Sequence, residues 1–294
     1  MKRPLFRGRG PLAIGTCALF AACLAAQVRV NYHNENFTLS DFDHFSATFE
    51  TSGVAFDGDG NPLKIEFAAS GTTITGNKAE GHAIRQANAG YYLQDSTITG
   101  SATLVMNSAA AQKTAKTPST ETTNTKIQSE VLKYSGTATD GRIEFPGAVV
   151  IDSSSSGTSQ SKDNKTTQFA RTLHLTGAKG FVTVLMNGTG NNALQTGEMD
   201  GPIVYSGKSE NTSEGKTDTT TFDGKADHMQ MDFTKEPRTL TLTGHVTLHS
   251  QGTVAAGDIS ADTVVVTVDA NLKPIKVDIT GSPAQTVYHK EPPR

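Results

Sequence analysis

One segment of the sequence begins like a calcium-binding loop. Asp57-Gly58-Asp59-Gly60-Asn61 places side-chain oxygens at the first, third and fifth positions, where they would converge on a calcium ion. The sixth position, however, is Pro62 instead of glycine, and the twelfth is Ala68 instead of glutamate. Because Asp, Gly, Asn and Pro also form turns, we expect a hairpin turn here and no calcium site.

Two histidines, His245 and His249, are four residues apart and therefore face one side of a strand. At about 3.3 Å per residue they lie roughly 13 Å apart, too far for one metal ion. No cysteine or acidic cluster joins them, so we expect both to face solvent and no metal site.

The sequence shows no catalytic motif. It lacks a Gly-x-Ser-x-Gly nucleophile elbow and a Gly-rich phosphate loop before a helix. We expect neither an enzyme nor a cofactor. A pair of glycosidase carboxylates has no sequence signature, so that one alternative stays open.

The composition suits strands with one apolar and one polar face. Of 294 residues, 35% are hydrophobic and 6% aromatic, and tryptophan is absent. The formal net charge is -3 and the basic residues form no patch beyond the N-terminus, which argues against nucleic acid as a partner.

The N-terminus predicts a signal peptide over residues 1–26 and export to the periplasm. Lys2, Arg3, Arg7 and Arg9 precede an apolar run of about 16 residues, shorter than the roughly 20 that a membrane span needs. Phe20-Ala21-Ala22-Cys23 resembles a degraded lipobox, so a lipoprotein acylated at Cys23 is an alternative, as is an uncleaved membrane anchor.

Downstream of the signal, short period-two runs alternate with Gly, Asn, Asp and Pro, which predicts an all-β chain of antiparallel hairpins. Three Ser- and Thr-rich tracts, 107–126, 153–168 and 208–221, are too polar to offset their ordering entropy, so we expect disordered hairpin tips. We expect an N-terminal β region over 27–145 and a C-terminal one over 146–294.

Two repeats point to stacked β units. Residues 56–67 align without a gap on residues 268–279, and a Thr-rich strand ending in glycine recurs at 96–100, 172–177 and 239–244. Each unit would complete the apolar face of its neighbour, giving an elongated roll or an open groove.

Three motifs near the C-terminus resemble the OstA-like family, the periplasmic lipopolysaccharide-transport proteins of Gram-negative bacteria. They are Leu242-Thr243-Gly244-His245-Val246-Thr247-Leu248, then Ile259-Ser260-Ala261-Asp262-Thr263-Val264-Val265-Val266, then Ile279-Thr280-Gly281-Ser282-Pro283-Ala284. His245 and Ser282 replace the asparagines of the family pattern. The match covers about 226–284, is looser over 43–106 and is poor between.

The resemblance implies an elongated, twisted β-jelly-roll, with two tandem OstA-like units as one arrangement. Its apolar interior groove would hold acyl chains of lipopolysaccharide or a related glycolipid. Its open edge strands would join other transport proteins of the envelope, or further copies head to tail. An ordinary closed core would be lined by the same residues. The groove candidates are Leu240, Leu242, Val246, Leu248, Val264, Val266, Ile275, Val277 and Ile279.

The sequence therefore leaves two functions. One is a periplasmic lipid carrier or bridge that passes lipopolysaccharide or a related glycolipid towards the outer membrane. The other is an exported structural or adhesive β-repeat protein without a lipid cargo.

Overall fold

A computed structural model describes residues 30–86, 90–112, 119–160, 165–185, 194–252, 256–268, 274–281 and 285–288. The expected signal peptide over 1–26, including Cys23, lies outside these residues. No helix in the described part of the chain has the length and hydropathy of a membrane span.

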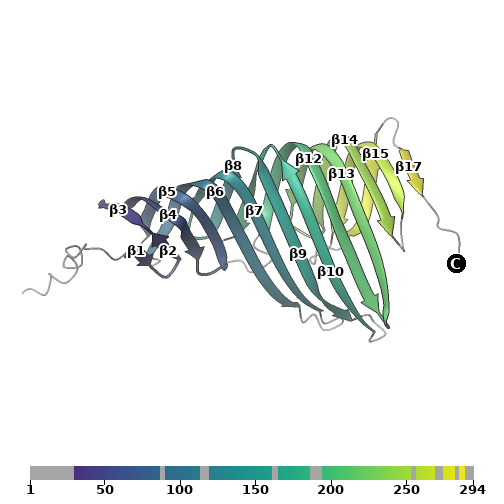
Figure 1. The fold of residues 1–294 in the computed structure, drawn as a ribbon, viewed down its shortest axis with the longest axis horizontal. Helices are drawn as coiled ribbons and strands as arrows, with labels where there is room; N and C mark the ends of the chain where they lie inside the picture. The colour runs from purple at the N-terminus through teal and green to yellow at the C-terminus, as the bar shows by residue number, and fades with distance from the viewer. Residues whose placement is uncertain are drawn as a thin grey trace, which may run out of the picture.

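The described chain is built of antiparallel strands, which confirms the predicted all-β, elongated class (Figure 1). The strands are β1 (Val30–His33), β2 (Phe37–Phe42), β3 (His44–Phe49), β4 (Gly53–Phe67), β5 (Thr72–Gln86), β6 (Gly90–Gln112), β7 (Ser119–Gly136), β8 (Asp140–Phe145), β9 (Val149–Gln160), β10 (Thr166–Gly177), β11 (Lys179–Leu185), β12 (Leu194–Ser213), β13 (Lys216–Asp232), β14 (Arg238–Gly252), β15 (Gly257–Val268), β16 (Pro274–Thr280) and β17 (Gln285–Tyr288).

The sheet is folded lengthwise along a line that we call the crease, where the long strands change register. On one side lies the long wall, formed by β1, β2, β9, β10, β17 and residues 63–67, 72–76, 102–112, 119–129, 203–213, 216–226, 246–252 and 257–261. On the other lies the short wall, formed by β3, β8, β11, β16 and residues 53–59, 78–86, 90–99, 131–136, 194–200, 228–232, 238–243 and 263–268.

The glycines of the Thr-rich repeat lie at the crease. Gly100 and Gly244 have φ angles of 81° and 73°, which favour glycine because it has no Cβ. A Cβ on Gly244 would lie 2.5 Å from a carboxylate oxygen of Asp227, and one on Gly100 would lie 2.8 Å from Cβ of Asn77. The same packing therefore recurs at both positions, and the repeat marks where the sheet bends.

The core lies between the walls. Because side chains alternate across a strand, each wall turns every second residue inwards, and the buried apolar residues among them form one cluster. Phe67 of the long wall and Tyr134 of the short wall touch across it, with ring centroids 5.1 Å apart.

The prediction of a hairpin turn at residues 57–62 is wrong. These residues lie inside β4, which continues through the crease from Gly53 to Phe67. Asp57 and Asp59 point outwards, towards Lys78 and His44 respectively, so their oxygens do not converge. Turn-forming residues here bend a strand without reversing it.

The disorder expected for the three polar tracts is wrong for their described residues. Residues 119–126 pair with 152–159, residues 153–160 with 166–173, and residues 208–213 with 216–221. Threonine suits strands, and the ladder satisfies the backbone groups of each tract. Residues 113–118 and 161–164 lie outside the described chain.

The sheet crosses the boundary expected at residues 145 and 146 without a break. β7 pairs with β9, and β8 pairs with β11, so strands from both expected regions alternate in one ladder. These residues therefore do not separate two sheets.

Candidate functional site

The nine predicted groove residues all lie on the inner faces of the two walls. On the short wall, Leu242 is paired with Val264, and Val264 with Ile279. On the long wall, Val246 is paired with Ala261 and Leu248 with Ile259. The period-two pattern therefore predicted the correct face for each residue.

Burial divides the nine residues into three groups. Leu242, Val246 and Val264 are at most 6% exposed and act as core residues. The four others, Leu240, Leu248, Val266 and Ile279, are partly buried, and the last three pack against the core. On the edge strand β16, Ile275 is 63% and Val277 47% exposed. The inner apolar face thus becomes accessible at the C-terminal end.

The N-terminal part of the interior is more tightly packed. Leu63, Ile65 and Leu104 are completely buried. At the end itself, the ring of Phe45 lies 5.1 Å from that of Phe42 and 6.3 Å from that of Phe56, measured between centroids. Here the interior is a filled core.

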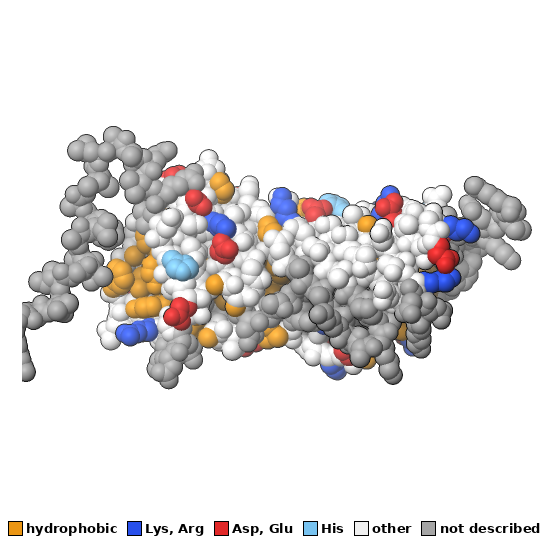
Figure 2. All heavy atoms as spheres, turned by 90° about the horizontal axis from the view of Figure 1, so that it is seen from below, with side chains coloured by type: hydrophobic (Ala, Val, Ile, Leu, Met, Phe, Trp, Pro, Cys, Tyr) orange, Lys and Arg blue, Asp and Glu red, His pale blue; other side chains and the backbone are white. Residues whose placement is uncertain are grey.

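Both ends of the molecule carry edge strands. Within the described residues, β1 pairs only with β2, and β3 only with β4. At the other end, β16 and β17 pair only with β15. The inner residue Phe49 of β3 is 76% exposed, and Figure 2 shows apolar side chains gathered at this N-terminal end. In the described part of the chain, each end therefore combines a strand that has one unpaired edge with exposed apolar side chains.

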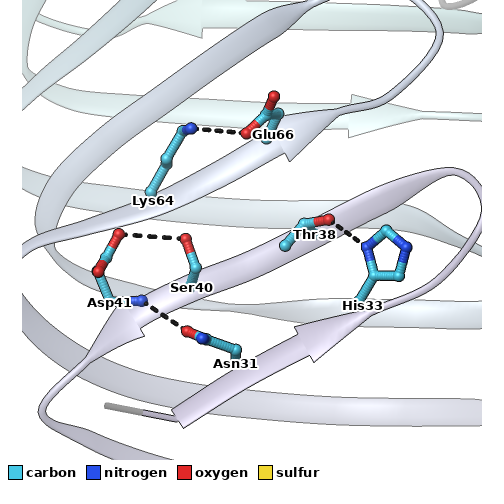
Figure 3. A network of polar contacts seen from close by, with 7 residues as sticks. All are labelled: Asn31, His33, Thr38, Ser40, Asp41, Lys64 and Glu66. Carbon is cyan, nitrogen blue, oxygen red and sulfur yellow. Dashed lines mark hydrogen bonds and ion pairs between the residues drawn. The ribbon is translucent and has the colours of Figure 1, made fainter.

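Polar contacts fix β1 to β2 on the outer surface of the N-terminal end (Figure 3). His33 Nδ1 lies 2.7 Å from Thr38 Oγ1, and the amide of Asp41 donates to Asn31 Oδ1 at 3.2 Å. The outer face of this edge is thus polar and its inner face apolar.

Two buried tyrosines of the interior stay neutral. The hydroxyl of Tyr205 donates to the backbone oxygen of Thr247 at 2.8 Å. Burial, with a smaller contribution from Asp223, raises the pKa of Tyr205 to about 12. Burial likewise raises the pKa of Tyr134. Neither phenol ionises near neutral pH.

Histidine–aspartate pairs recur on the outer face, always between neighbouring strands. They are His44 with Asp59, His82 with Asp95, His174 with Asp152, His228 with Asp200, His245 with Asp227, and His249 with Asp258. The exposed positions of His245 and His249 agree with the prediction of solvent-facing histidines. Sequence reasoning missed the pairs because they depend on cross-strand register.

We predict that the pKa of His82 is above its ordinary value of 6.5 and that D95N returns it towards 6.5, as measured by NMR titration. The side-chain hydrogen bond to Asp95, then its charge, raises this pKa. The pair therefore contributes stability below pH 6.5, which is lost as pH rises through the raised pKa. D258N is the control, since it leaves His82 with its partner. An unchanged His82 titration in D95N would refute the assignment.

One acidic cluster could hold a cation. Ligand atoms of Glu198, Asp200 and His228 lie within 4.8 Å of one another on the outer face. Lys179 Nζ, however, is 3.2 Å from Asp200 Oδ2. Hydrogen bonds from His228 and then Lys179 lower the pKa of Asp200. An ion-pair network thus occupies the place of a metal.

A shallow hollow of about 610 Å³ lies on the outer face of the long wall. Its charged lining residues, Lys126, Asp152, His174 and Asp223, stand in one cross-strand row together with Ser206. His174 Nδ1 is 2.7 Å from Asp152 Oδ1. Charges of both signs are therefore present side by side.

Searches of protein-family models, of curated proteins and of solved structures each find no match to this chain. The resemblance of its three C-terminal motifs to the OstA-like family stays a prediction.

Proposed function

We propose that the protein is an exported, non-enzymatic lipid carrier or bridge that passes lipopolysaccharide or a related glycolipid across the periplasm. The observation that carries the proposal is the apolar inner face that opens at β16, where Ile275 and Val277 are exposed. Acyl chains bind such a surface through burial alone, at about 25 cal/mol per Å² of apolar area.

The edge strands support a bridge made of several units. β3 carries Phe49 at one end, and β16 carries Ile275 and Val277 at the other. If β16 of one copy added to β3 of the next, or to an edge strand of another envelope protein, the backbone groups would pair and the apolar faces would become continuous.

Retention of a lipid by the exported protein tests the proposal. The protein, purified from a periplasmic extract, is incubated with a fluorescent fatty-acyl probe or with labelled lipopolysaccharide and then passed through a gel-filtration column. We expect both labels to elute with the protein, and unlabelled lipopolysaccharide to displace the acyl probe. If the protein retains neither label, the carrier proposal fails and the structural or adhesive alternative remains. That alternative needs only a packed core, such as the one at the N-terminal end.

A further inference from the structure

Within the described residues, the long wall extends beyond the short wall in the middle of the molecule. β9 and β10 of the long wall have 12 residues each, whereas β8 and β11 of the short wall have 6 and 7. At about 3.3 Å per residue, the long wall reaches roughly 15–20 Å further from the crease. The extended strands are visible below β7, β9, β10 and β13 in Figure 1. We call this part the overhang.

The inner face changes from apolar to polar as it passes from the core into the overhang. An apolar cross-strand row near the core consists of Ile127, Ile151, Leu175 and Tyr205. Four residues further along each strand, roughly 13 Å away, lies a polar row. It consists of Thr123, Ser155, Arg171, Ser209 and Thr220. One continuous surface therefore matches both parts of an amphiphile.

A buried hydroxyl of the polar row has no partner. Thr123 is 6% exposed, points to the inner face, and its Oγ1 makes no hydrogen bond. Buried polar groups are otherwise almost always hydrogen-bonded, because leaving one unpaired is costly. A ligand hydroxyl at this row would supply the missing bond.

The charges next to the row argue against an anionic ligand group. Arg171 lies over the ring of Phe169, 4.6 Å from its centroid. The inner face also carries the buried carboxylate of Glu121 and the carboxylate of Asp218. Among the described inner-face residues of this part of the wall, cations do not outnumber anions. Most groups of the row are hydroxyls, which both donate and accept hydrogen bonds. A neutral, hydroxyl-rich group fits this surface better than a phosphate.

We infer that the overhang binds the sugar head group of an amphiphile whose acyl chains lie on the apolar rows nearer the crease. The inference rests on the proposed carrier function and adds a second contact that distinguishes glycolipids from other lipids. Acyl burial would supply affinity, and the polar row would supply selectivity.

Three probes test the inference, each added to the full exported protein below its micelle concentration. Dodecyl maltoside carries a sugar, the dodecyl ether of triethylene glycol has the same alkyl chain without a sugar, and free maltose has no chain. Calorimetry is expected to show that the maltoside binds about tenfold more tightly than the ether. If free maltose binds without an alkyl chain, the ligand is a free sugar, and the inference that the overhang binds an amphiphile is overturned.

The variant T123V/S155A/S209A removes three hydroxyls from the polar row. We expect it to lose the tenfold preference for the maltoside and to bind the ether as the natural protein does. The control S154A/T172V/T221V removes three hydroxyls from a row of the same wall that faces outwards and lines the outer hollow. It should keep the preference. If the control variant loses the preference and the triple variant of the polar row keeps it, the sugar binds at the outer hollow. That result would overturn the inference.

A single substitution covers the case in which the triple variant does not fold. T123V removes an unpartnered hydroxyl with little change of shape, so we expect slightly greater resistance to urea without ligand and weaker maltoside binding. A purely structural role would not move these two properties in opposite directions. If the natural protein binds ether and maltoside equally, the sugar site fails and the carrier stands. If it binds neither, the carrier function fails as well.

Discussion

Replacing Leu104 by alanine is expected to lower the free energy of unfolding by about 2–5 kcal/mol, measured by urea denaturation. Leu104 is completely buried on the inner face of β6, and its cross-strand neighbours Ile74 and Ile127 are at most 2% exposed. Truncation removes apolar contacts and leaves a cavity that three strands of a paired sheet cannot close easily. The loss would show that the N-terminal interior is a packed core.

Val204→Ala is the matched control. Val204 lies on the outer side of β12 and is 44% exposed, so its truncation should change stability by no more than about 0.5 kcal/mol. If L104A cost as little as V204A, the inner face around β6 would be loosely filled, and the division between a closed N-terminal and an open C-terminal interior would be wrong.

The faces of the strands were predictable from the sequence because side-chain direction depends only on alternation along one strand. Leu240 and Leu242, or Val264 and Val266, must share a face in any register. Whether a residue is core or accessible depends instead on its strand's neighbours. Val277 is exposed because β16 is an edge strand, which no pattern within 274–280 reveals.

The crease was not predictable from local residue types. Asp57 to Pro62 contains good turn formers, but turn chemistry says only that the chain bends. The continuation of β4 is determined by its pairing with β5 on both sides of the bend. The recurring Thr-Gly steps, such as Thr243-Gly244, were a signal for the crease that repeat alignment found without explaining.

The prediction that the polar tracts are disordered was wrong for a related physical reason. Composition measures how much apolar area a segment can bury, and residues 153–160 bury little. Their backbone groups, however, pair on one side with β7 and on the other with β10. Such cross-strand partners are distant in sequence, so composition cannot include them. The polar row of the overhang also depends on these cross-strand partners, so the sequence did not predict it.

A charge at the open end of the interior is expected to weaken acyl binding by at least about tenfold. Val277 faces inwards on β16 and is 47% exposed, so aspartate can be accommodated there without burying its carboxylate in the free protein. A bound acyl chain would either cover the carboxylate, which costs desolvation, or leave this part of the groove. Titration of the natural protein and V277D with the fluorescent acyl probe measures the difference.

Lys276→Gln is the control, because it also lowers the net charge by one but acts on the outer face of the same strand, where Lys276 Nζ lies 2.8 Å from Asp278 Oδ1. It should leave acyl binding unchanged. Because β16 is also an edge strand, light scattering must accompany the titration at the same protein concentration. A loss of affinity in V277D without a change of mass places the lipid at the open end, whereas unchanged affinity would show that acyl chains do not bind there.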